Sequence, residues 1–325
     1  MLYISRSETD PYFNIAAEEY VLKEFTEDVF MLWQNEPSVI VGKHQNTLAE
    51  INYQYVHQNN IPVIRRITGG GTVYHDMGNL NFSFVKKGKS NELVNFKAFT
   101  NPIIATLQSM GVNAKFEGKN DLRVEGKKIS GNAEHVFKNR VLHHGTLLFS
   151  SELDKLNQSI LAKTENFQDK AVKSNRSVVA NISEFLEVPM PIETFKDEIS
   201  KQIMLKDTEA KIYTFTQKDK EKIMELVESK YSRWSWNYAY SPKYIFTKNI
   251  QIGSFKSQLQ ISVKNGIIKD LIFDKKNEAE KNALSLKKLL IDSAHEPEDI
   301  KSRLMKASKL FKDEKEINTL LQTLF

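Results

Sequence analysis

The chain of 325 residues contains no cysteine. This absence excludes a thiolate nucleophile, a thioester on the enzyme, a zinc site built from thiolates and any disulfide bond. It also fits a reducing compartment, so we expect the protein to work in the cytoplasm.

Long apolar runs are missing as well. No stretch of about 18 apolar residues occurs, and the N-terminal sequence MLYISRSETDPYFNIAAEEY lacks the basic start and apolar centre of a signal peptide. Hydrophobic residues make up 40% and charged residues 27% of the chain, as in ordinary globular proteins. We therefore expect no membrane segment, and one large domain or two unequal ones.

Charge of one sign is not concentrated anywhere. The net charge is +5, but the lysines are scattered, and no basic run with interleaved aromatic residues marks a nucleic-acid surface. A positive balance also suits acidic protein partners or phosphorylated substrates. We expect such partners, and no nucleic acid.

The first 150 residues mix helical and strand patterns. Helices are predicted for 12–25, behind Asp10 and Pro11, for 51–60, and for 92–110 with Gly111 as a C-cap. Strands are predicted for 29–34, 38–45, 61–66, for 79–86 with Leu80, Phe82 and Phe84 on one face, and three times within 120–150 around a tight turn at Glu125–Gly126. Such a mixture predicts an α+β fold with a mixed or mostly antiparallel sheet.

The second half divides near residue 243. Residues 151–232 have a mainly helical, charged pattern. In the preceding half, Pro102 is expected to kink or bound the helix predicted for 92–110. Residues 243–274 predict a small meander of strands with a turn at Asn265–Gly266, and 278–325 predict helices. We therefore expect a domain over 1–242 and a small α+β domain over 243–325.

Three consecutive glycines stand out in the stretch RRITGGGTVYHDMGN, residues 65–79. Glycine lets a ligand lie against the main chain, with amides turned toward anionic oxygens, and phosphate is the natural candidate. The stretch is neither a P-loop nor a dinucleotide fingerprint, and on its glycines alone a tight strand connection stays open. Arg65 and Arg66 could pair with phosphate, and the polar residues His75, Asp76 and Asn79 follow.

A second polar group lies in KNDLRVEGKKISGNAEH. Adjacent residues of a strand point to opposite faces, so regular alternation places Lys128 and Ser130 on one face and Lys127 and Ile129 on the other. At most one of the two lysines can then point into a site. The alternative that both lie on a solvated surface hairpin stays open. In LHHGTLLF the same rule separates His143 from His144, which makes a metal held by both improbable and predicts a buried, hydrogen-bonding histidine.

Together these three motifs resemble the lipoate–protein ligases, in order and spacing over residues 1–240. That family belongs with the biotin protein ligases and resembles the cores of class II aminoacyl-tRNA synthetases. The resemblance implies a mixed sheet wrapped by helices with a small C-terminal domain. It also implies a two-step reaction, in which lipoate and ATP form lipoyl-AMP and the acyl group then passes to a lysine of a lipoyl domain.

The resemblance also implies site residues. Lys128 would be the catalytic lysine that contacts both the carboxylate and the α-phosphate, and Asp121 the carboxylate that meets Mg²⁺. The residues implied for ATP and lipoyl-AMP are Arg66, Gly69, Gly70, Gly71, Thr72, Val73, Tyr74, His75, Asn79, Asn120, Asp121, Lys128 and Ser130. Those implied for lipoate are Trp33, Gly71, Lys128, Arg140 and His144, with Val41, Gly42 and Val73 as further apolar candidates.

Three alternatives remain open. An octanoyl or lipoyl transferase of the same fold would need a cysteine nucleophile, which this chain lacks. A biotin protein ligase would arrange its arginine and glycine loop differently, and a non-catalytic scaffold that binds acyl carriers would not need Lys128, Arg66 and Asp121. The expected acceptors are acidic lipoyl domains of 2-oxoacid dehydrogenase E2 subunits or the glycine cleavage H protein, and the expected state is a monomer.

Overall fold

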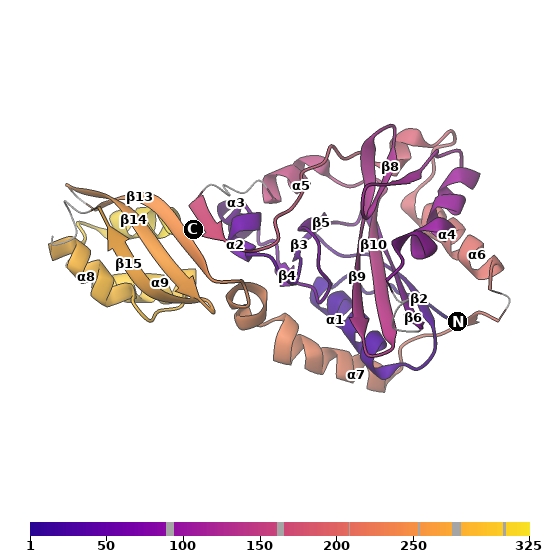
Figure 1. Ribbon diagram of the computed structural model, residues 1–325, viewed down its shortest axis with the longest axis horizontal. Coiled ribbons are helices and arrows are strands. Elements are labelled where there is room, and N and C mark those ends of the chain that lie inside the picture. The colour runs from indigo at the N-terminus through magenta and orange to yellow at the C-terminus, as the bar shows by residue number, and fades with distance from the viewer. Residues whose placement is uncertain (89–93, 161–165, 208, 253, 275–280, 308–309) are drawn as a thin grey trace. The chain divides into compact units, whose positions relative to one another are not determined.

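The computed structural model describes all residues except 89–93, 161–165, 208, 253, 275–280 and 308–309. The chain forms two compact units (Figure 1). The first unit holds Met1–Lys43, Ile61–Gln158 and Ser174–Arg233, and the second holds His44–Asn60, Ser159–Lys173 and Trp234–Phe325. The sequence placed all of the second domain after residue 242, whereas the second unit also takes in two earlier stretches.

An eight-stranded sheet forms the centre of the first unit, in the order β12-β1-β2-β6-β10-β9-β8-β7. β1 pairs in parallel with β2 and β12, and the remaining pairs are antiparallel. The predicted α+β fold with a mixed sheet is thus confirmed. The strands are β1 (Leu2–Ser5), β2 (Val29–Trp33), β6 (Asn79–Lys87), β7 (Lys115–Glu117), β8 (Asp121–Val124), β9 (Lys127–Phe137), β10 (Arg140–Leu148) and β12 (Lys211–Ile212).

Helices α4 (Phe96–Ser109) and α6 (Ile192–Leu205) cover one face of this sheet (Figure 1). They pack on β6 through a buried cluster that includes the three residues predicted to share a face, Leu80, Phe82 and Phe84. α4 runs on through Pro102, so this proline does not bound it. Met110 is the C-cap of α4, and Gly111 follows it with a φ of +83°, so the glycine predicted to end the helix lies one residue beyond the cap.

Helix α1 (Pro11–Glu24) lies on the other face. Its start is fixed as predicted, because the Asp10 side chain accepts a hydrogen bond from the backbone N–H of Phe13 at 2.7 Å. Helix α7 (Gln217–Leu226) packs on α1 and continues into a π-helical turn, Val227–Tyr231. Asp219 of α7 accepts from the hydroxyl of Tyr20 in α1 at 2.7 Å, which ties the two helices together.

A separate three-stranded sheet, in the order β4-β3-β5, carries the glycine triplet. It consists of β3 (Ser38–Val41), β4 (Val63–Arg65) and β5 (Val73–His75), and the triplet connects β4 to β5. The strand predicted for 38–45 is therefore confirmed only for its first half. The triplet is a connection between strands, as its glycines alone suggested.

The region 151–232 is only partly helical. It contains α5 (Leu153–Ser159), α6, α7 and the short 3₁₀ turn Ile182–Phe185. Residues 170–178 have no helical assignment, so the helical prediction is wrong there. Nearby, the backbone pairs with β9, because Lys128 donates its N–H to Val178 at 2.8 Å and accepts from Ala180 at 3.1 Å.

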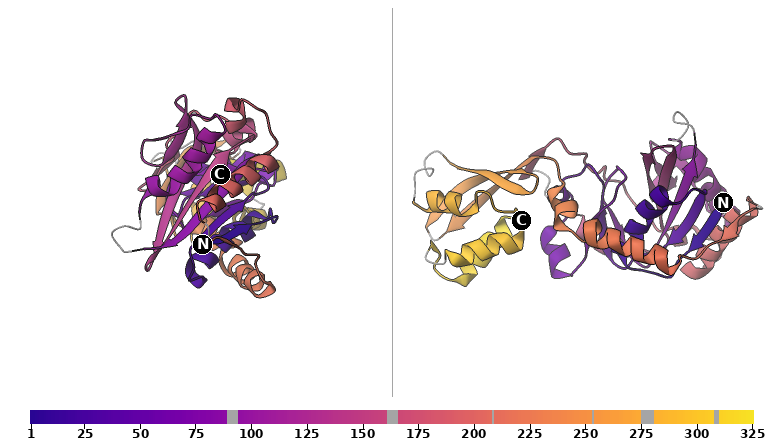
Figure 2. Two further views of the ribbon diagram at one scale, coloured as in Figure 1. Left: turned by 90° about the vertical axis from the view of Figure 1, so that its right-hand side faces the viewer. Right: turned by 90° about the horizontal axis from the view of Figure 1, so that it is seen from below.

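The second unit is a four-stranded antiparallel sheet, β11-β13-β14-β15, with helices packed on it (Figure 2). Asn265 and Gly266 have φ values of 53° and 72°, which confirms the predicted turn. The helices predicted beyond 278 are present. The elements are α2 (Thr47–Glu50), α3 (Tyr53–Gln58), β11 (Phe167–Asp169), the π-helical turn Ser235–Ala239, β13 (Tyr244–Ile252), β14 (Phe255–Lys264), β15 (Ile267–Phe273), α8 (Lys281–Leu290), α9 (Pro297–Lys306) and α10 (Glu314–Thr323).

Early segments help to build the core of the second unit. Leu48, Ala49 and Phe167 belong to the same buried cluster as Phe246 and Leu286. The predicted helix at 51–60 is present as α3, while α2 was not predicted. Among the described helices, none has the length and apolar character needed to cross a bilayer.

Candidate active site

The β8–β9 hairpin presents Lys128. Its turn has positive φ at both Glu125 (51°) and Gly126 (76°), as predicted. The pairing then shifts, since Leu122 faces Ser130 but Arg123 faces Lys128, which leaves Ile129 as an extra residue in β9. Because of this bulge, the prediction that Lys128 and Ser130 share a face is wrong.

The bulge gathers a charged group on one face. Lys128 shares that face with Arg123, Asp121 and Gly131, while Ser130 is fully buried on the other face. The Nζ of Lys128 lies 2.8 Å from Oδ1 of Asp121, and the two side chains are 23% and 16% exposed. A Cβ added to Gly131 would lie 3.0 Å from that Nζ, so the lysine passes closely over a bare stretch of backbone.

Arg123 is a charged member of this group that the sequence analysis missed. Its Nη2 donates to Oδ2 of Asp121 at 2.8 Å and to the Ser177 hydroxyl at 3.0 Å. Its Nη1 donates to the carbonyl of Gly126 at 2.8 Å. The spacing of Asp121 and Arg123, two apart in a strand, was the signal that could have revealed it.

The carboxylate of Asp121 is therefore held by two cations. Each of its oxygens lies 2.8 Å from one of them. Within the described ranges, no three histidine, cysteine or acidic side chains come together as metal ligands. Mg²⁺ in nucleotide sites is usually held by one or two carboxylates together with phosphate oxygens, so the contact of Asp121 with Mg²⁺ stays a prediction.

The Arg66 side chain holds the glycine triplet by hydrogen bonds to its backbone. Its Nη2 donates to the carbonyls of Gly69 at 2.6 Å and Gly71 at 2.7 Å, and its Nε donates to the Thr68 hydroxyl at 2.8 Å. Burial lowers the pKa of Arg66 to about 10, so it remains a cation at neutral pH. These bonds hold the loop, and the expected pairing of Arg66 with phosphate stays a prediction.

The loop geometry also needs its middle glycine. Gly70 has a φ of +86°, and a Cβ there would lie 3.1 Å from Nη2 of Arg66. Arg65 is used in a similar way, because its Nη1 donates to the carbonyls of Gly42 and Lys43, each at 3.0 Å. Arg66 thus holds the backbone of the glycine triplet, and Arg65 holds the backbone that follows β3.

The segment Ser174–Ala180 joins the glycine loop to the hairpin. The backbone N–H of Thr72 donates to the Ser174 hydroxyl at 2.9 Å, and a Cβ on Gly71 would lie 3.0 Å from that hydroxyl oxygen. At its other end, the segment bonds to Arg123 and to the backbone of Lys128. The loop and the hairpin, far apart in sequence, are therefore linked through this segment by contacts that the sequence analysis missed.

His144 and Glu18 form a buried polar pair beside the loop. Both carboxylate oxygens of Glu18 lie 2.9 Å from Nδ1 of His144, whose Nε2 lies 2.8 Å from the Thr68 hydroxyl. On the opposite face, His143 bonds to Glu134 at 2.8 Å and stacks on Phe99. The predicted separation of the two histidines is confirmed, and both are buried.

Trp33 is connected to the same pair. Its Nε1 donates to the Ser83 hydroxyl at 2.9 Å, and Ser83 donates to Glu18 at 2.6 Å. His75 packs edge-on against Trp33 with ring centroids 5.8 Å apart, and its Nδ1 lies 3.0 Å from the Asn35 amide nitrogen. Trp33, His75 and His144 thus lie in one buried region of the first unit.

His75 keeps one ring nitrogen unsatisfied. Burial first, and then the charges of Arg66 and His144, lower its pKa to about 3, so the ring is neutral. Because Nδ1 accepts from Asn35, the proton lies on Nε2, which has no partner among the described residues. A buried donor of this kind can be satisfied by a polar atom of a ligand.

Three further predicted residues make hydrogen bonds within the first unit, and their contact with a ligand stays a prediction. Asn120 donates from its side chain to the carbonyl of Asn132, which extends the hairpin, and Asn79 donates to Asn81 at 2.9 Å. Arg140 donates to the carbonyls of Phe25 and of Glu27, the latter at 2.7 Å. It lies four positions from His144, about 13 Å along β10, and is not brought together with Lys128.

Val41 and Gly42, at the end of β3, are buried, whereas Val73, at the start of β5, is half-buried. Tyr74 is buried. These residues belong to the small sheet that carries the triplet or directly follow one of its strands. They provide apolar surface there, and their contact with a ligand stays a prediction.

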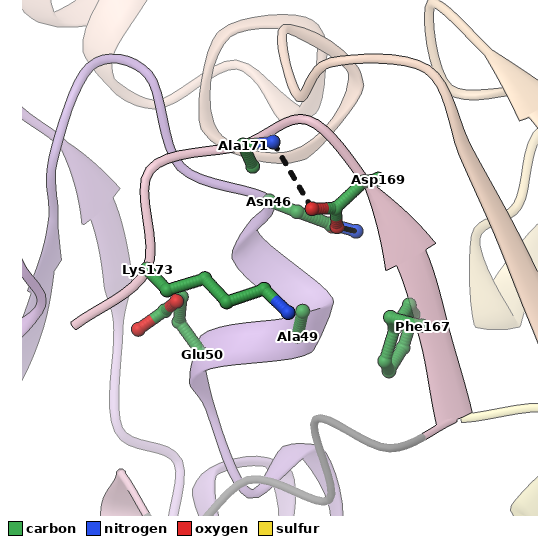
Figure 3. Close-up of a pocket in the computed structure, with 7 residues that line it drawn as sticks. All are labelled: Asn46, Ala49, Glu50, Phe167, Asp169, Ala171 and Lys173. Carbon is green, nitrogen blue, oxygen red and sulfur yellow. Dashed lines mark hydrogen bonds between the residues drawn. The ribbon is translucent and has the colours of Figure 1, made fainter.

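A cavity in the second unit is too small to be the site (Figure 3). Its volume is about 10 Å³, room for about one water molecule. Asn46 and the backbone of Ala171 both donate to Asp169, at 2.9 and 3.0 Å. None of the predicted site residues lines it.

Known proteins with the same sequence pattern exist. Residues 10–204 match the family model for the lipoyl protein ligase A/B catalytic domain. Lipoate–protein ligase 1 of Staphylococcus aureus is 46% identical over 271 residues, which cover 82% of this chain and 82% of that protein. Both matches include the hairpin and the glycine loop.

Solved structures share the fold. A lipoate protein ligase of Thermoplasma acidophilum with bound lipoic acid, and lipoate-protein ligase A bound with ATP, each show 25% identity and a TM-score of 0.62, covering 73% of this chain and 98% of theirs. An archaeal lipoylation system from T. acidophilum, a bipartite ligase and its E2 lipoyl domain, matches with 25% identity, a TM-score of 0.62 and coverage of 73% and 95%. With the family model and the S. aureus relative both covering most of the hairpin-bearing unit, this chain belongs to the lipoate–protein ligases of the lipoyl protein ligase A/B family.

Proposed function

We propose that the protein is an ATP-dependent lipoate–protein ligase, with Lys128 as its catalytic residue. The observation that carries this proposal is the Lys128 ammonium, which lies over Gly131 on a side chain that is 23% exposed, beside a segment that is bonded to the glycine loop. The lipoate-bound and ATP-bound relatives support the choice of substrates.

In the first step, a carboxylate oxygen of lipoate attacks the α-phosphorus of ATP, and the bond to pyrophosphate breaks. Two anions must approach each other, and the Lys128 ammonium offsets their repulsion as charge builds. Loss of one such donor typically costs about 3–4 kcal/mol in barrier height. The glycine triplet would let the nucleotide approach the main chain of residues 69–74.

In the second step, a neutral lysine amine of the acceptor attacks the acyl carbon, and AMP leaves. The mixed anhydride is already activated, so no nucleophile of the enzyme is needed, in agreement with the absence of cysteine. The transferase alternative lacks its nucleophile here.

The acyl chain of lipoate would occupy the region of Trp33, His75 and His144. Mg²⁺ would enter with ATP, bound to its phosphate oxygens. We assign the catalytic part to residues 1–242 and an accessory role to 243–325. For the other residues that the resemblance implies, contact with ATP or lipoate stays a prediction.

We further infer that the acceptor is a lipoyl domain, as in the archaeal system with its E2 lipoyl domain. We propose that this lipoyl domain belongs to an E2 subunit or is the H protein. We also propose that the enzyme is a monomer and works in the cytoplasm. The net charge of +5 would assist the encounter with an acidic lipoyl domain.

Mass spectrometry of an apo lipoyl domain tests the proposal directly. The domain is incubated with enzyme, MgATP and lipoate, beside octanoate and biotin, and we expect a lipoyl mass gain that requires ATP. Modification without ATP, or by biotin alone, would support the rival enzymes.

Lys128→Ala should abolish lipoate-dependent pyrophosphate release without loss of the fold. Lys127→Ala is the matched control, because Lys127 is exposed on the opposite face, near the ring of Phe185. Near-normal release by Lys128→Ala would refute the catalytic assignment.

A further inference from the structure

We propose that Arg123 is a positioning residue, which acts through Asp121 to keep the Lys128 ammonium available to anionic substrates. The inference rests on the proposed ligase function. It assigns a role to a side chain that neither the motif nor the family resemblance singled out.

The geometry is an ion triad on two neighbouring strands. Asp121 receives Lys128 on Oδ1 and Arg123 on Oδ2, each at 2.8 Å. The formal charge of the three groups is one positive charge in total. A pair of Asp121 and Lys128 alone would be neutral, and its carboxylate would compete with substrate anions for the ammonium.

The two cations are held differently. Arg123 is anchored at three groups, the carboxylate, the Ser177 hydroxyl and the Gly126 carbonyl, and its guanidinium is planar and rigid. Lys128 has a single ionic partner among the described residues and a flexible four-carbon stem. When anions arrive, Lys128 is therefore the cation that leaves Asp121.

Arg123 makes this departure favourable. Without it, each movement of Lys128 would leave a half-buried carboxylate unpaired, which is strongly disfavoured. With it, Asp121 remains hydrogen-bonded while Lys128 turns toward the carboxylate and the α-phosphate. The arginine thus influences substrate binding without touching substrate.

The first test compares Arg123→Gln with the wild type by pyrophosphate release. We expect the KM for lipoate and for ATP to rise about tenfold, with a smaller change in kcat, because a ground-state competitor for Lys128 is strengthened. Arg123→Lys should show an intermediate KM, since lysine keeps the charge but cannot hold three partners at once. Lys201→Gln, a 66% exposed surface lysine, is the matched control and should match the wild type.

The second test is a double-mutant cycle. If Arg123 acts through Asp121, adding Arg123→Gln to Asp121→Asn should change KM less than twofold, because the competing charge is already gone. An equal effect in both backgrounds would overturn the proposal. So would an unchanged KM in Arg123→Gln.

Ser177→Ala separates this role from a purely structural one. If it reproduces the KM rise of Arg123→Gln, the arginine acts by anchoring the segment Ser174–Ala180, and the proposal is wrong. Thermal melting of each variant checks the fold, and Arg123→Lys carries the same comparison if Arg123→Gln does not fold. Absence of lipoate-dependent release by the wild type would refute the ligase function itself, which is a distinct result.

Discussion

The carboxylate of Glu18 grips the imidazole of His144, with both oxygens 2.9 Å from Nδ1. The other ring nitrogen of His144, Nε2, lies 2.8 Å from the Thr68 hydroxyl, whose oxygen accepts a hydrogen bond from Nε of Arg66. Helix α1 is thereby connected to the glycine loop through side chains alone. The shape of the loop should therefore also depend on Glu18, which belongs to a different element of the fold.

Thr68→Val tests this connection. Valine has the same shape but leaves Nε of Arg66 and Nε2 of His144 unpaired in a buried region, which should cost about 1–3 kcal/mol of stability. We expect a higher KM for lipoate in steady-state assays and a lower midpoint in urea. Thr106→Val, at a buried threonine of α4 that bonds to the Pro102 carbonyl, should leave KM unchanged. Equal KM values in both variants would contradict the connection.

Gly131→Ala should separate activity from stability. Its new methyl group would lie 3.0 Å from both Cε and Nζ of Lys128, so the lysine must shift by a few tenths of an ångström. Displacing a catalytic group commonly lowers kcat/KM by about ten- to a hundredfold. The free energy of unfolding should stay the same or rise, because alanine suits a strand better than glycine. A variant with full activity would show that the position of Lys128 is not critical.

Gly70→Ala and Gly118→Ala form a matched pair. Both glycines have positive φ, +86° and +66°, but only a Cβ at Gly70 meets another group, Nη2 of Arg66. Alanine at such a φ should cost about 1–2 kcal/mol in each case, measured by denaturant unfolding. Only Gly70→Ala should also reduce lipoate-dependent pyrophosphate release. Similar losses of activity in both variants would remove the special role of the loop.

Asp219 predicts a pH dependence of stability. Burial raises the pKa of this carboxyl, but hydrogen bonds from Tyr20, Tyr213 and Thr216 outweigh burial and lower it from 3.8 to about 2. The unfolded chain therefore binds the proton first, so the contribution of Asp219 is complete above pH 3.8 and is lost as the pH falls through about 2. In urea unfolding, Asp219→Asn should be about 2 kcal/mol less stable at pH 7. That difference should shrink between pH 4 and 2, and a constant difference would contradict the assignment.

Features with local causes could be predicted from the sequence. The turns at Glu125–Gly126 and Asn265–Gly266 follow from backbone preferences of two residues, and the start of α1 follows from Asp10 and Pro11. The shared face of Leu80, Phe82 and Phe84 follows from the two-residue period of a strand.

Features that depend on distant partners could not. Regular alternation fails after Lys128 because a bulge at Ile129 depends on pairing with β8. Arg66 resembles a phosphate ligand in sequence, but its partners are the carbonyls of the loop that follows it. Glu18 looks like one more charged residue of a helix, and only the fold shows that it is buried against His144.

The composition of the second unit limits how this protein can be cut. Its core includes Leu48, Ala49 and Phe167 together with residues from β13 onward, so the chain enters that unit three separate times. A fragment ending near residue 242 would keep these three apolar side chains but lose the strands and helices that shield them from water. Such a fragment should aggregate unless Leu48, Ala49 and Phe167 are replaced by polar residues. A separate study of the first unit therefore requires these substitutions in addition to a shorter chain.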